Sequence, residues 1–443
     1  MAESKGRGIT VLMLPWLGYS HVSSYLELGK RLTKRGVSVH LCSTPVNLAS
    51  VKKALLNSPS IKTIEIFLPN LPELPPHYHT VNGLPPNLLS TLRKAFDMAA
   101  PNLSDIIRTL KPDLLINDIF QHWAPQVALS QNVPTVSYIT NGAVTTCYWT
   151  HFEINGRHSP FPYPEIYVTD YEKAKFEKLM KVHAHGIGTA ERVSTCVRES
   201  KLILVKSCDE IEGKYIDYFS TLCRKKVLPV GLLVSETVDW KQDDDCEIFE
   251  WLDKKDEAST LFVSMGTECH LSKEEVEEMA SGLELSGVNF IWVVKCPDRD
   301  FIGDFLKIFR ERIGEKGIIL ETWAPQTRIL AHPSIGGFVS HCGRGSVTEA
   351  LAYGVPIIAM PMQYDQPLNA RVVNEAGLGA EVKRDGNGRF RGSDIAEVIK
   401  KVVVHKDGDE IRRKTKDLSK SRRESGDKYV DIVVEELLQL CNI

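Results

Sequence analysis

Apolar and polar positions alternate in a regular order from the beginning of the chain. Residues 8–14 form a short apolar run, and after a loop the side chains of Tyr25, Leu28 and Leu32 recur with the spacing of one helix face. A second apolar run begins at Val37. This order predicts a strand, a helix and a second strand parallel to the first, so we expect a doubly wound α/β sheet.

The second half of the chain repeats this alternation. Residues 260–264 and 289–294 are apolar runs, and Ser272 and Glu275 between them have the spacing of a capping box at the start of a helix. Because 443 residues exceed what a single hydrophobic core usually serves, we expect two α/β domains with a cleft between them.

Residues 145–200 interrupt the pattern. Periodicity lapses there, and prolines break the segment at Pro160, Pro162 and Pro164. We expect an irregular insert that forms one wall of a substrate pocket.

Composition narrows the range of partners. With 54 basic and 57 acidic residues the net charge is −3, which argues against a nucleic acid or an anionic membrane as the partner. No apolar run reaches the roughly 20 residues that span a bilayer, and the N-terminal run is too short for a secretory signal. The ten cysteines form no CxxC pair, so we expect reduced thiols and no structural zinc. We expect a cytoplasmic monomer that binds small molecules and does not insert into membranes.

Two polar residues follow predicted strands of the N-terminal sheet. His21 lies in the loop after residues 8–14, and Asp118 follows the apolar run 114–116. Because parallel strands end at one edge of a sheet, the imidazole and the carboxylate can meet there as a base and its orienting partner. Simpler alternatives stay open, since His21 can be a capping or surface residue and Asp118 can cap the following helix.

A glycine-rich turn in the second half has the form of an anion site. The apolar run 335–339 ends in the sequence His341-Cys342-Gly343-Arg344-Gly345-Ser346. An Ala/Leu-rich segment follows, and a break at 354–356 precedes another apolar run. This pattern predicts a strand, a tight turn, a helix and a strand. Backbone N–H groups at such a helix N-terminus attract an anion, commonly a phosphate.

Motifs with fixed spacing surround this turn. They are Trp323-Ala324-Pro325-Gln326, His341-Cys342-Gly343, Ser346, Glu349-Ala350-Leu351, Gly354-Val355-Pro356 and Asp365-Gln366. Together they resemble the plant secondary product glycosyltransferase box, the donor-sugar signature of the family 1 glycosyltransferases that use UDP-sugars. His21, Asp118 with residues 123–125 after it, and the turn 264–267 also stand at that family's spacings. The resemblance extends over the whole chain.

Four shorter stretches resemble one branch of that family, which adds a sugar to the sugar of an existing glycoside. They are Pro15-Trp16-Leu17, Leu84-Pro85-Pro86, Glu212-Gly213-Lys214-Tyr215 and Asp365-Gln366-Pro367-Leu368-Asn369-Ala370. The resemblance implies a hexosyltransferase whose acceptor is a flavonoid or terpenoid glycoside.

The resemblance also implies a GT-B fold, in which two doubly wound Rossmann-like domains face each other across a cleft. The expected parts are an N-terminal acceptor-binding domain at residues 1–232, a linker at 233–247, a C-terminal UDP-sugar-binding domain at 248–424, and a C-terminal helix at 425–443 that packs back on the N-terminal domain.

The resemblance implies that Ala324 and the residues beside it contact the nucleoside of the donor. Trp323 would stack its indole on uracil, Gln326 would bond the nucleoside, and Glu349 would bind the ribose hydroxyls. The alternatives are that Trp323 is an ordinary core or rim residue, and that Ser346 and Glu349 form a capping box.

For the diphosphate and the sugar, the implied contacts lie around the glycine turn. The diphosphate would be held by His341, Ser346 and the amides of Gly345 and Ser346, with Gly343, Arg344 and Thr267 beside them. Asp365 and Gln366 would bond the hydroxyls of the sugar, although Asp365 can instead be a helix N-cap. No metal ion and no cofactor is expected, and the UDP-sugar is a co-substrate.

The implied reaction is a single inverting displacement. His21 removes the proton of the acceptor hydroxyl as its oxygen attacks the anomeric carbon, UDP departs, and Asp118 stabilises the imidazolium. An α-linked donor then gives a β-glycoside. We expect Gly18, Tyr19 and Trp123 to contact the acceptor.

Two residues depart from the family pattern. Arg344-Gly345 stands where the family usually has Trp-Asn, so the side-chain contact of that Asn with the phosphates is missing. A guanidinium binds a carboxylate with two parallel hydrogen bonds, which suggests UDP-glucuronate as an alternative donor. Gln366 is the residue usual in glucosyl-transferring members, and Arg344 can instead pair with an acidic neighbour or face the phosphates. We therefore favour UDP-glucose.

Other classes of protein agree less well with the sequence than a glycosyltransferase does. A non-catalytic GT-B binding protein would explain the altered Arg344-Gly345 pair, but the chain keeps both His21 and Asp118. A nucleotide-sugar epimerase or a dinucleotide dehydrogenase fits less well, because the first predicted βα turn lacks the G-x-G-x-x-G sequence that the dehydrogenase needs.

Overall fold

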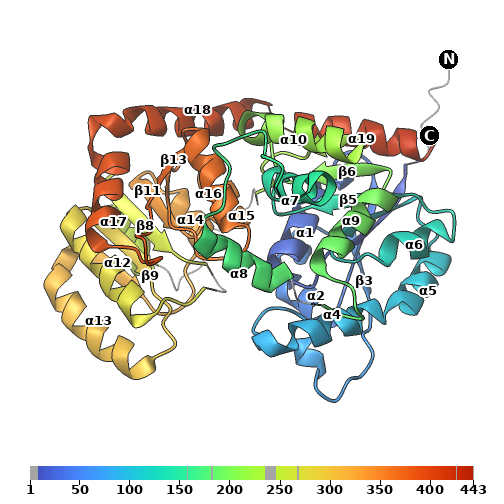
Figure 1. Ribbon diagram of the computed structural model, residues 1–443, viewed down its shortest axis with the longest axis horizontal. Coiled ribbons are helices and arrows are strands. Elements are labelled where there is room, and N and C mark those ends of the chain that lie inside the picture. The colour runs from blue at the N-terminus through green and yellow to red at the C-terminus, as the bar shows by residue number, and fades with distance from the viewer. Residues whose placement is uncertain are drawn as a thin grey trace. The chain divides into compact units, whose positions relative to one another are not determined.

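The computed structural model describes residues 8–156, 158–180, 183–234, 246–266, 269–425 and 427–442. The chain forms two compact units (Figure 1). Unit 1 consists of Met1–Pro162, Ala174–Leu233 and Asp427–Ile443, and unit 2 of Tyr163–Lys173 and Val234–Gly426. Most of the predicted linker, residues 235–245, lies outside the described residues.

Unit 1 is built around a seven-stranded sheet in the order β3-β2-β1-β4-β5-β6-β7, and every pair of neighbours is parallel. The strands are β1 (Thr10–Leu14), β2 (Ser38–Ser43), β3 (Ile61–Glu65), β4 (Leu114–Asp118), β5 (Thr135–Ile139), β6 (Leu202–Val205) and β7 (Val227–Pro229). The helices are α1 (Tyr19–Thr33), α2 (Pro45–Ser50), α3 (Lys52–Leu56), α4 (Leu89–Asp97), α5 (Ala100–Leu110), α6 (Ala124–Leu129), α7 (Ala143–Asn155), α9 (Thr189–Glu199), α10 (Asp209–Cys223) and α19 (Lys428–Leu440).

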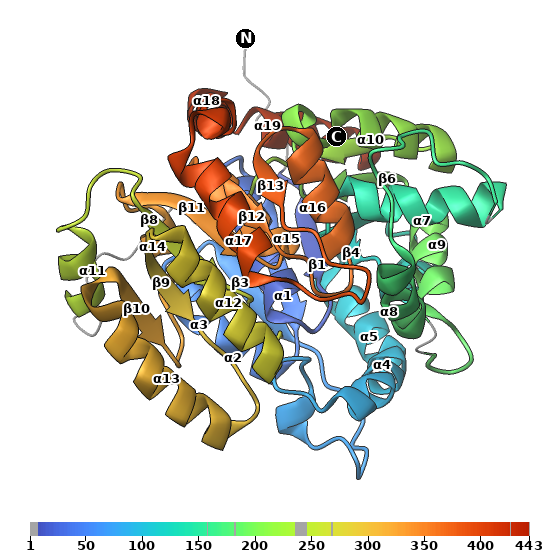
Figure 2. The ribbon, with the colours of Figure 1, turned by 60° about the vertical axis from the view of Figure 1, so that its left-hand side comes forward.

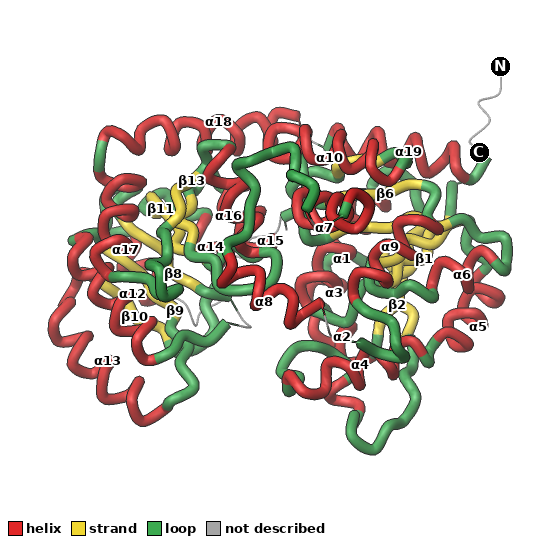
Figure 3. Tube along the Cα trace, in the orientation of Figure 1, coloured by secondary structure: helices red, strands yellow, loops and turns green. Residues whose placement is uncertain are grey.

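Unit 2 has a six-stranded parallel sheet in the order β10-β9-β8-β11-β12-β13. Its strands are β8 (Thr260–Ser264), β9 (Asn289–Val293), β10 (Gly317–Leu320), β11 (Ile335–Ser340), β12 (Ile357–Ala359) and β13 (Gly379–Glu381). Its helices are α11 (Cys246–Leu252), α12 (Lys273–Ser286), α13 (Arg299–Ile313), α14 (Gln326–Leu330), α15 (Arg344–Ala352), α16 (Gln366–Glu375), α17 (Gly392–Ile399) and α18 (Asp409–Ser425). In both units helices enclose the strands (Figure 3).

Strand β1 shows why the central strands are apolar throughout. Val11 and Met13 are buried in the core on one face of the sheet, and Leu12 and Leu14 are buried in the core on the other face. Successive side chains of a strand point to opposite faces, and helices cover both faces of a parallel sheet.

The last helix, α19, belongs to unit 1. Its residues Val430, Val433 and Leu437 are buried in the same core as Val11, and Tyr429 donates its hydroxyl proton to Glu210 Oε2 of α10 at 2.9 Å. Figure 2 shows α19 near α10.

The capping box predicted at the start of α12 is confirmed. Ser272 Oγ accepts a hydrogen bond from Glu275 N at 3.2 Å, and Glu275 Oε2 accepts one from Ser272 N at 3.0 Å. The cysteines among the described residues are free thiols. Of the helices in the described part of the chain, none is long and apolar enough to cross a membrane.

The structure corrects the prediction for residues 145–200. The segment is largely helical, with α7, α8 (Asp170–Met180) and α9, because the three prolines interrupt the chain only between α7 and α8. Residues Tyr163–Lys173 were assigned to the N-terminal domain with their neighbours, but they belong to unit 2. Contacts with residues much later in the sequence attach Tyr163–Lys173 to unit 2.

Each sheet has one point at which the strand order reverses. In unit 1 this point lies between β1 and β4, and in unit 2 between β8 and β11. The connections that leave these neighbouring strands run to opposite sides of the sheet, so the crevice beyond their carboxyl ends is where ligands of such folds bind. His21 and His341 follow β1 and β11 and Asp118 ends β4, whereas Trp323 and Gln326 follow β10, and Asp365 and Gln366 follow β12.

Candidate functional site

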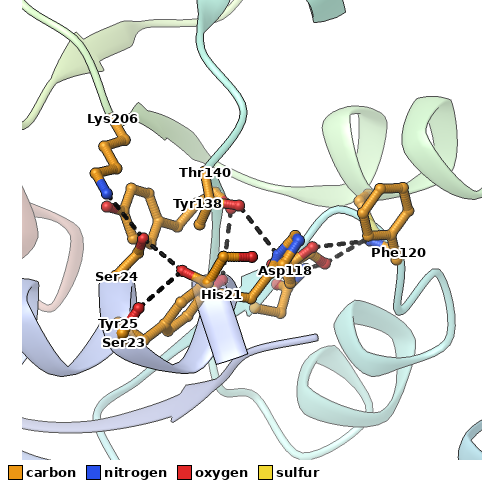
Figure 4. Close-up of polar contacts among 12 residues, drawn as sticks. His21, Ser23, Ser24, Tyr25, Asp118, Phe120, Tyr138, Thr140 and Lys206 are labelled. Atoms are coloured by element: carbon orange, nitrogen blue, oxygen red, sulfur yellow. Dashed lines mark hydrogen bonds and ion pairs between the residues drawn. The ribbon is translucent and has the colours of Figure 1, made fainter. Parts of the chain in front are cut away.

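In unit 1 the structure brings His21 and Asp118 together at the point where the strand order reverses. His21 lies in the first turn of α1, which follows β1, and Asp118 is the last residue of β4. His21 Nδ1 and Asp118 Oδ2 are 2.7 Å apart (Figure 4). The Asp118 side chain is 0% exposed and that of His21 18%, so the carboxylate is buried behind an imidazole that reaches the surface.

The hydrogen bonds around this pair select one tautomer of the imidazole. Asp118 accepts from His21 Nδ1 through Oδ2 and from Phe120 N through Oδ1 at 3.4 Å. With the proton on Nδ1, Nε2 carries the lone pair and can act as a base. Thr140 Oγ1 lies 3.0 Å from the same Nδ1. Sequence reasoning missed Thr140, although it directly follows β5 and the strand-end rule that found Asp118 also applies to it.

The capping alternatives for the two residues are wrong. Gly18 is the N-cap of α1 and no side chain caps that helix, so His21 is not a cap. Asp118 does not cap the next helix, because α6 begins at Ala124 with Trp123 as its N-cap.

In unit 2 the loop after β11 is tightly folded around His341. An ideal Cβ on Gly266 would lie 2.7 Å from the His341 ring, and one on Gly343 would lie 2.5 Å from it, so only glycine fits at both positions. Burial lowers the pKa of His341 to about 4, because the charged imidazolium loses its hydration. His341 is therefore a neutral side chain near pH 7.

Helix α15 begins directly after this loop and presents its N-terminus there. Gly343 is the N-cap, and the first hydrogen bond of the helix runs from Val347 N to Gly343 O at 3.0 Å. The amides of Gly345 and Ser346 precede that bond, and N–H groups at this position point away from the helix toward a possible anion. The turn thus has the geometry that the sequence predicted for an anion site.

The capping-box alternative for Ser346 and Glu349 is wrong, because Gly343 occupies the N-cap position. Both side chains instead contact Gln326 at the start of α14. Gln326 Nε2 donates to Glu349 Oε2 at 2.8 Å and to Ser346 Oγ at 3.4 Å. The structure therefore gathers the three residues predicted to contact the nucleoside, the ribose and the phosphates.

Asp365 and Gln366 lie at the beginning of α16. Gln366 Oε1 accepts from the backbone N of Met362 at 3.0 Å and of Gln363 at 2.8 Å. These two bonds fix the orientation of the amide, which leaves its NH2 group to donate to a ligand. Asp365 is the N-cap residue as the alternative proposed, but its side chain makes no capping bond.

Asn369 links this turn to the loop after β11, and sequence reasoning did not find it. Its Nδ2 donates to Asp365 Oδ2 at 2.9 Å and to Cys342 O at 3.0 Å. Cys342, whose carbonyl accepts one of these bonds, and Tyr364, which precedes Asp365, have left-handed backbone at φ 63° and 58°. Such conformations cluster at binding sites, where the surrounding structure holds them. Two sequence signals point to Asn369: it stands in the stretch 365–370 that resembles the sugar-branching members, and it is four residues from Asp365 on one helix.

The remaining residues predicted for the donor site are Trp323, Ala324, Thr267, Arg344 and Gly345, and the structure treats them differently. Trp323 is 71% exposed, which excludes the core alternative and leaves the indole able to stack on a ligand, whereas the neighbouring Ala324 is buried. Thr267 lies outside the described residues. Arg344 is buried as the first residue of α15, and Gly345 has open space where a Cβ would stand.

The acceptor contacts are only partly supported. Tyr19 is 52% exposed at the start of α1, and Gly18 precedes it as the N-cap. Trp123 is 7% exposed and packs edge-on against Phe96 in the core, so its contact with the acceptor stays a prediction. Phe120 lies closer to the pair, with its ring centroid 5.8 Å from that of His21.

Comparisons with known proteins agree with this arrangement. Residues 167–419 match the family described as "UDP-glucoronosyl and UDP-glucosyl transferase". The chain is 47% identical over 441 residues to the beta-D-glucosyl crocetin beta-1,6-glucosyltransferase of Gardenia jasminoides, with 97% of this chain and 98% of the relative covered. It is 43% identical over 440 residues to the cyanidin-3-O-glucoside 2-O-glucuronosyltransferase of Bellis perennis, with 98% and 97% covered.

A solved structure shows the same fold. It is a Glycyrrhiza uralensis UGT complexed with glycyrrhetinic acid 3-O-monoglucuronide, with a TM-score of 0.84, 23% identity, and 98% of this chain and 96% of that chain covered. The two parallel-sheet units and this likeness show a GT-B fold, as the sequence predicted. The chain belongs to the UDP-glucuronosyl and UDP-glucosyl transferase family, and it is a UDP-glycosyltransferase.

The low pKa of His341 gives a prediction that needs no substrate. NMR of imidazole-labelled protein, with the His341 signal assigned from a His341→Gln variant, should show no titration of that ring between pH 8 and 5.5. The unfolded chain takes up this proton near pH 6.5 and the folded chain near 4, so this residue lowers the stability of unit 2 as the pH falls across that window. A midpoint above pH 6 would contradict the buried, neutral imidazole.

Proposed function

We propose that this enzyme is an inverting transferase that moves a sugar from a UDP-sugar to the sugar of an existing flavonoid or terpenoid glycoside, with UDP-glucose as the preferred donor. The observation that carries the proposal is the hydrogen bond of 2.7 Å between His21 and Asp118 at the ends of β1 and β4. It supplies an oriented base at the place in unit 1 where ligands of such folds bind. A cytoplasmic monomer is part of the same proposal.

In the proposed reaction His21 acts as the general base. Nε2 takes the proton of the acceptor hydroxyl while its oxygen attacks the anomeric carbon and the bond to UDP breaks. Asp118 is buried and accepts the Nδ1 proton, so it stabilises the imidazolium that forms, as the aspartate does in a catalytic triad. Attack from the face opposite the leaving group converts an α-linked donor into a β-glycoside.

The proposed donor site uses neutral groups of unit 2. The diphosphate would accept hydrogen bonds from the amides of Gly345 and Ser346 at the positive end of α15, beside the neutral His341. The exposed indole of Trp323 would stack on uracil. In this arrangement the protein stabilises the departing UDP by itself, so the proposal includes no metal ion.

Relatives support transfer to an existing sugar. The Gardenia jasminoides enzyme is named for a glucosylated crocetin and the Bellis perennis enzyme for a cyanidin glucoside, and each aligns with nearly the whole of this chain. We extend that acceptor class to this enzyme.

Two observations bear on the donor, and they favour different sugars. Gln366 accepts two backbone hydrogen bonds through Oε1 and would donate from its NH2 group to a sugar hydroxyl, which suits a neutral hexose, and the Gardenia jasminoides relative is named a glucosyltransferase. Arg344 favours a donor carboxylate, and the Bellis perennis relative is named a glucuronosyltransferase. We therefore propose UDP-glucose first and UDP-glucuronate as the alternative.

The role of His21 is tested by His21→Ala. Loss of the general base should lower kcat about 10²–10⁴-fold and leave the Kd for the UDP-sugar unchanged, because all proposed donor contacts lie in unit 2. Turnover is measured by release of UDP and donor binding by calorimetry. The control is His405→Ala, an exposed histidine of unit 2. Wild-type turnover in His21→Ala would exclude this base, and a wild type that binds UDP-glucose but releases no UDP with any glycoside would indicate a binding protein.

The choice of donor is tested at the two residues that depart from the family pattern. With one acceptor, kcat/KM is compared for UDP-glucose and UDP-glucuronate in the wild type, Arg344→Trp and Gly345→Asn. We expect the wild type to favour UDP-glucose, and Gly345→Asn to bind either donor more tightly, because its side chain enters open space beside the diphosphate site. A wild-type preference for UDP-glucuronate that Arg344→Trp abolishes would establish the alternative donor.

A further inference from the structure

Residues Tyr163–Lys173 form a strap that is part of unit 2, while the chain on both sides of it belongs to unit 1. Its main attachment is Glu172, whose side chain is 8% exposed. Both carboxylate oxygens of Glu172 accept hydrogen bonds from Arg371 Nη2, at 2.9 and 3.0 Å. The backbone N of Thr169 also donates to Glu172 Oε2 at 2.8 Å, so the carboxylate is fixed within the strap as well.

Arg371 lies in α16 and joins three parts of unit 2. Besides the bonds to Glu172, its Nη1 donates to Pro367 O in the first turn of α16 at 3.0 Å and lies 3.2 Å from Glu381 Oε1 at the end of β13. Its guanidinium is 4.8 Å from the ring centroid of Tyr167 in the strap. The side chain is only 5% exposed, so these groups form most of its surroundings.

Arg371 bonds the first turn of α16, and the residues proposed to contact the sugar lie at the start of this turn. Pro367 directly follows Asp365 and Gln366, and Asn369 of the same helix bonds both Asp365 and the loop after β11. The position of α16 therefore sets the distance between the groups that would bind the sugar and the loop that would bind the diphosphate. Hydrogen bonds to a sugar weaken steeply when donor and acceptor move apart.

We infer that Glu172 is a positioning residue for the donor sugar: by holding Arg371 it fixes the first turn of α16, and with it Asp365 and Gln366, relative to the diphosphate loop. This inference rests on the proposed role of Asp365 and Gln366 as sugar contacts. It assigns to a strap encoded in the first half of the chain a part in recognising the sugar in unit 2.

Two features allow Glu172 to be replaced without unfolding the unit. The strap has a second attachment, where the guanidinium of Arg384 lies 5.3 Å from the ring centroid of Tyr171 and the Tyr171 ring packs against Gly388. Arg371 also keeps a counter-charge in Glu381. Burial raises the pKa of Glu381 to about 7, although the positive charge of Arg371 opposes that shift, so this carboxylate is ionised at pH 8.

The test is Glu172→Gln, assayed at pH 8 beside the control Glu165→Gln, which removes the same charge from an exposed position of the strap. We measure the Kd for UDP and for UDP-glucose, and KM and kcat for UDP-glucose. Glu172→Gln should raise the Kd and KM for UDP-glucose about tenfold and change the Kd for UDP less than twofold. Arg371→Lys keeps the charge, but its single nitrogen cannot bond Glu172 and also Pro367 O and Glu381. It should show the same difference between the two ligands, and it is used alone if Glu172→Gln does not fold.

The outcomes separate this inference from the proposed function. Asp365→Ala tests the sugar contact itself, and if it leaves UDP-glucose binding unchanged, the proposed donor site is wrong. If Asp365→Ala weakens UDP-glucose binding but Glu172→Gln does not, the positioning role of Glu172 is wrong. Equal weakening of UDP and UDP-glucose in Glu172→Gln would also overturn it, because a general loss of structure affects both ligands alike.

Discussion

The structure depends on one constraint of parallel sheets: every strand ends at the same edge, and the order of the strands reverses only once in each sheet. In unit 1 that reversal separates β1 from β4 and places His21 next to Asp118. In unit 2 it separates β8 from β11 and places Gly266 against His341. Each unit thus forms its own site from residues distant in sequence. The backbone hydrogen bonds between the strands bring these residues together.

Burial gives these sites their chemical properties, because every buried polar group there needs a partner. Asp118 is completely buried and accepts from the His21 imidazole and from the Phe120 amide, which fixes the tautomer of the base. Arg371 is almost as deeply buried and is compensated by Glu172 and Glu381. Asp118 and Arg371 each have two partners, so their networks keep the side chains in one arrangement.

Local patterns in the sequence predicted much of this. The alternation of apolar runs and amphipathic segments predicted both sheets, the spacing of Ser272 and Glu275 predicted a cap, and the strand-end rule placed His21 beside Asp118. The fixed motifs identified the family. Each of these signals lies within a short window or follows from the order of strands.

The errors came from contacts that have no local signal. Glu172 and Arg371 are 199 positions apart, so the strap was assigned with its neighbours in sequence. No local pattern indicated that the Trp123 indole packs against Phe96 in the core. Whether Ser346 caps α15 depends on the residue at which the helix begins, and a spacing shared by a cap and a ligand site cannot decide that.

The most direct test of the account is a crystal structure of the protein with UDP bound. The account predicts that the diphosphate lies at the N-terminus of α15, within hydrogen-bond distance of the amides of Gly345 and Ser346, with uracil stacked on Trp323. UDP bound elsewhere in unit 2, or at the ends of β1 and β4 in unit 1, would contradict it.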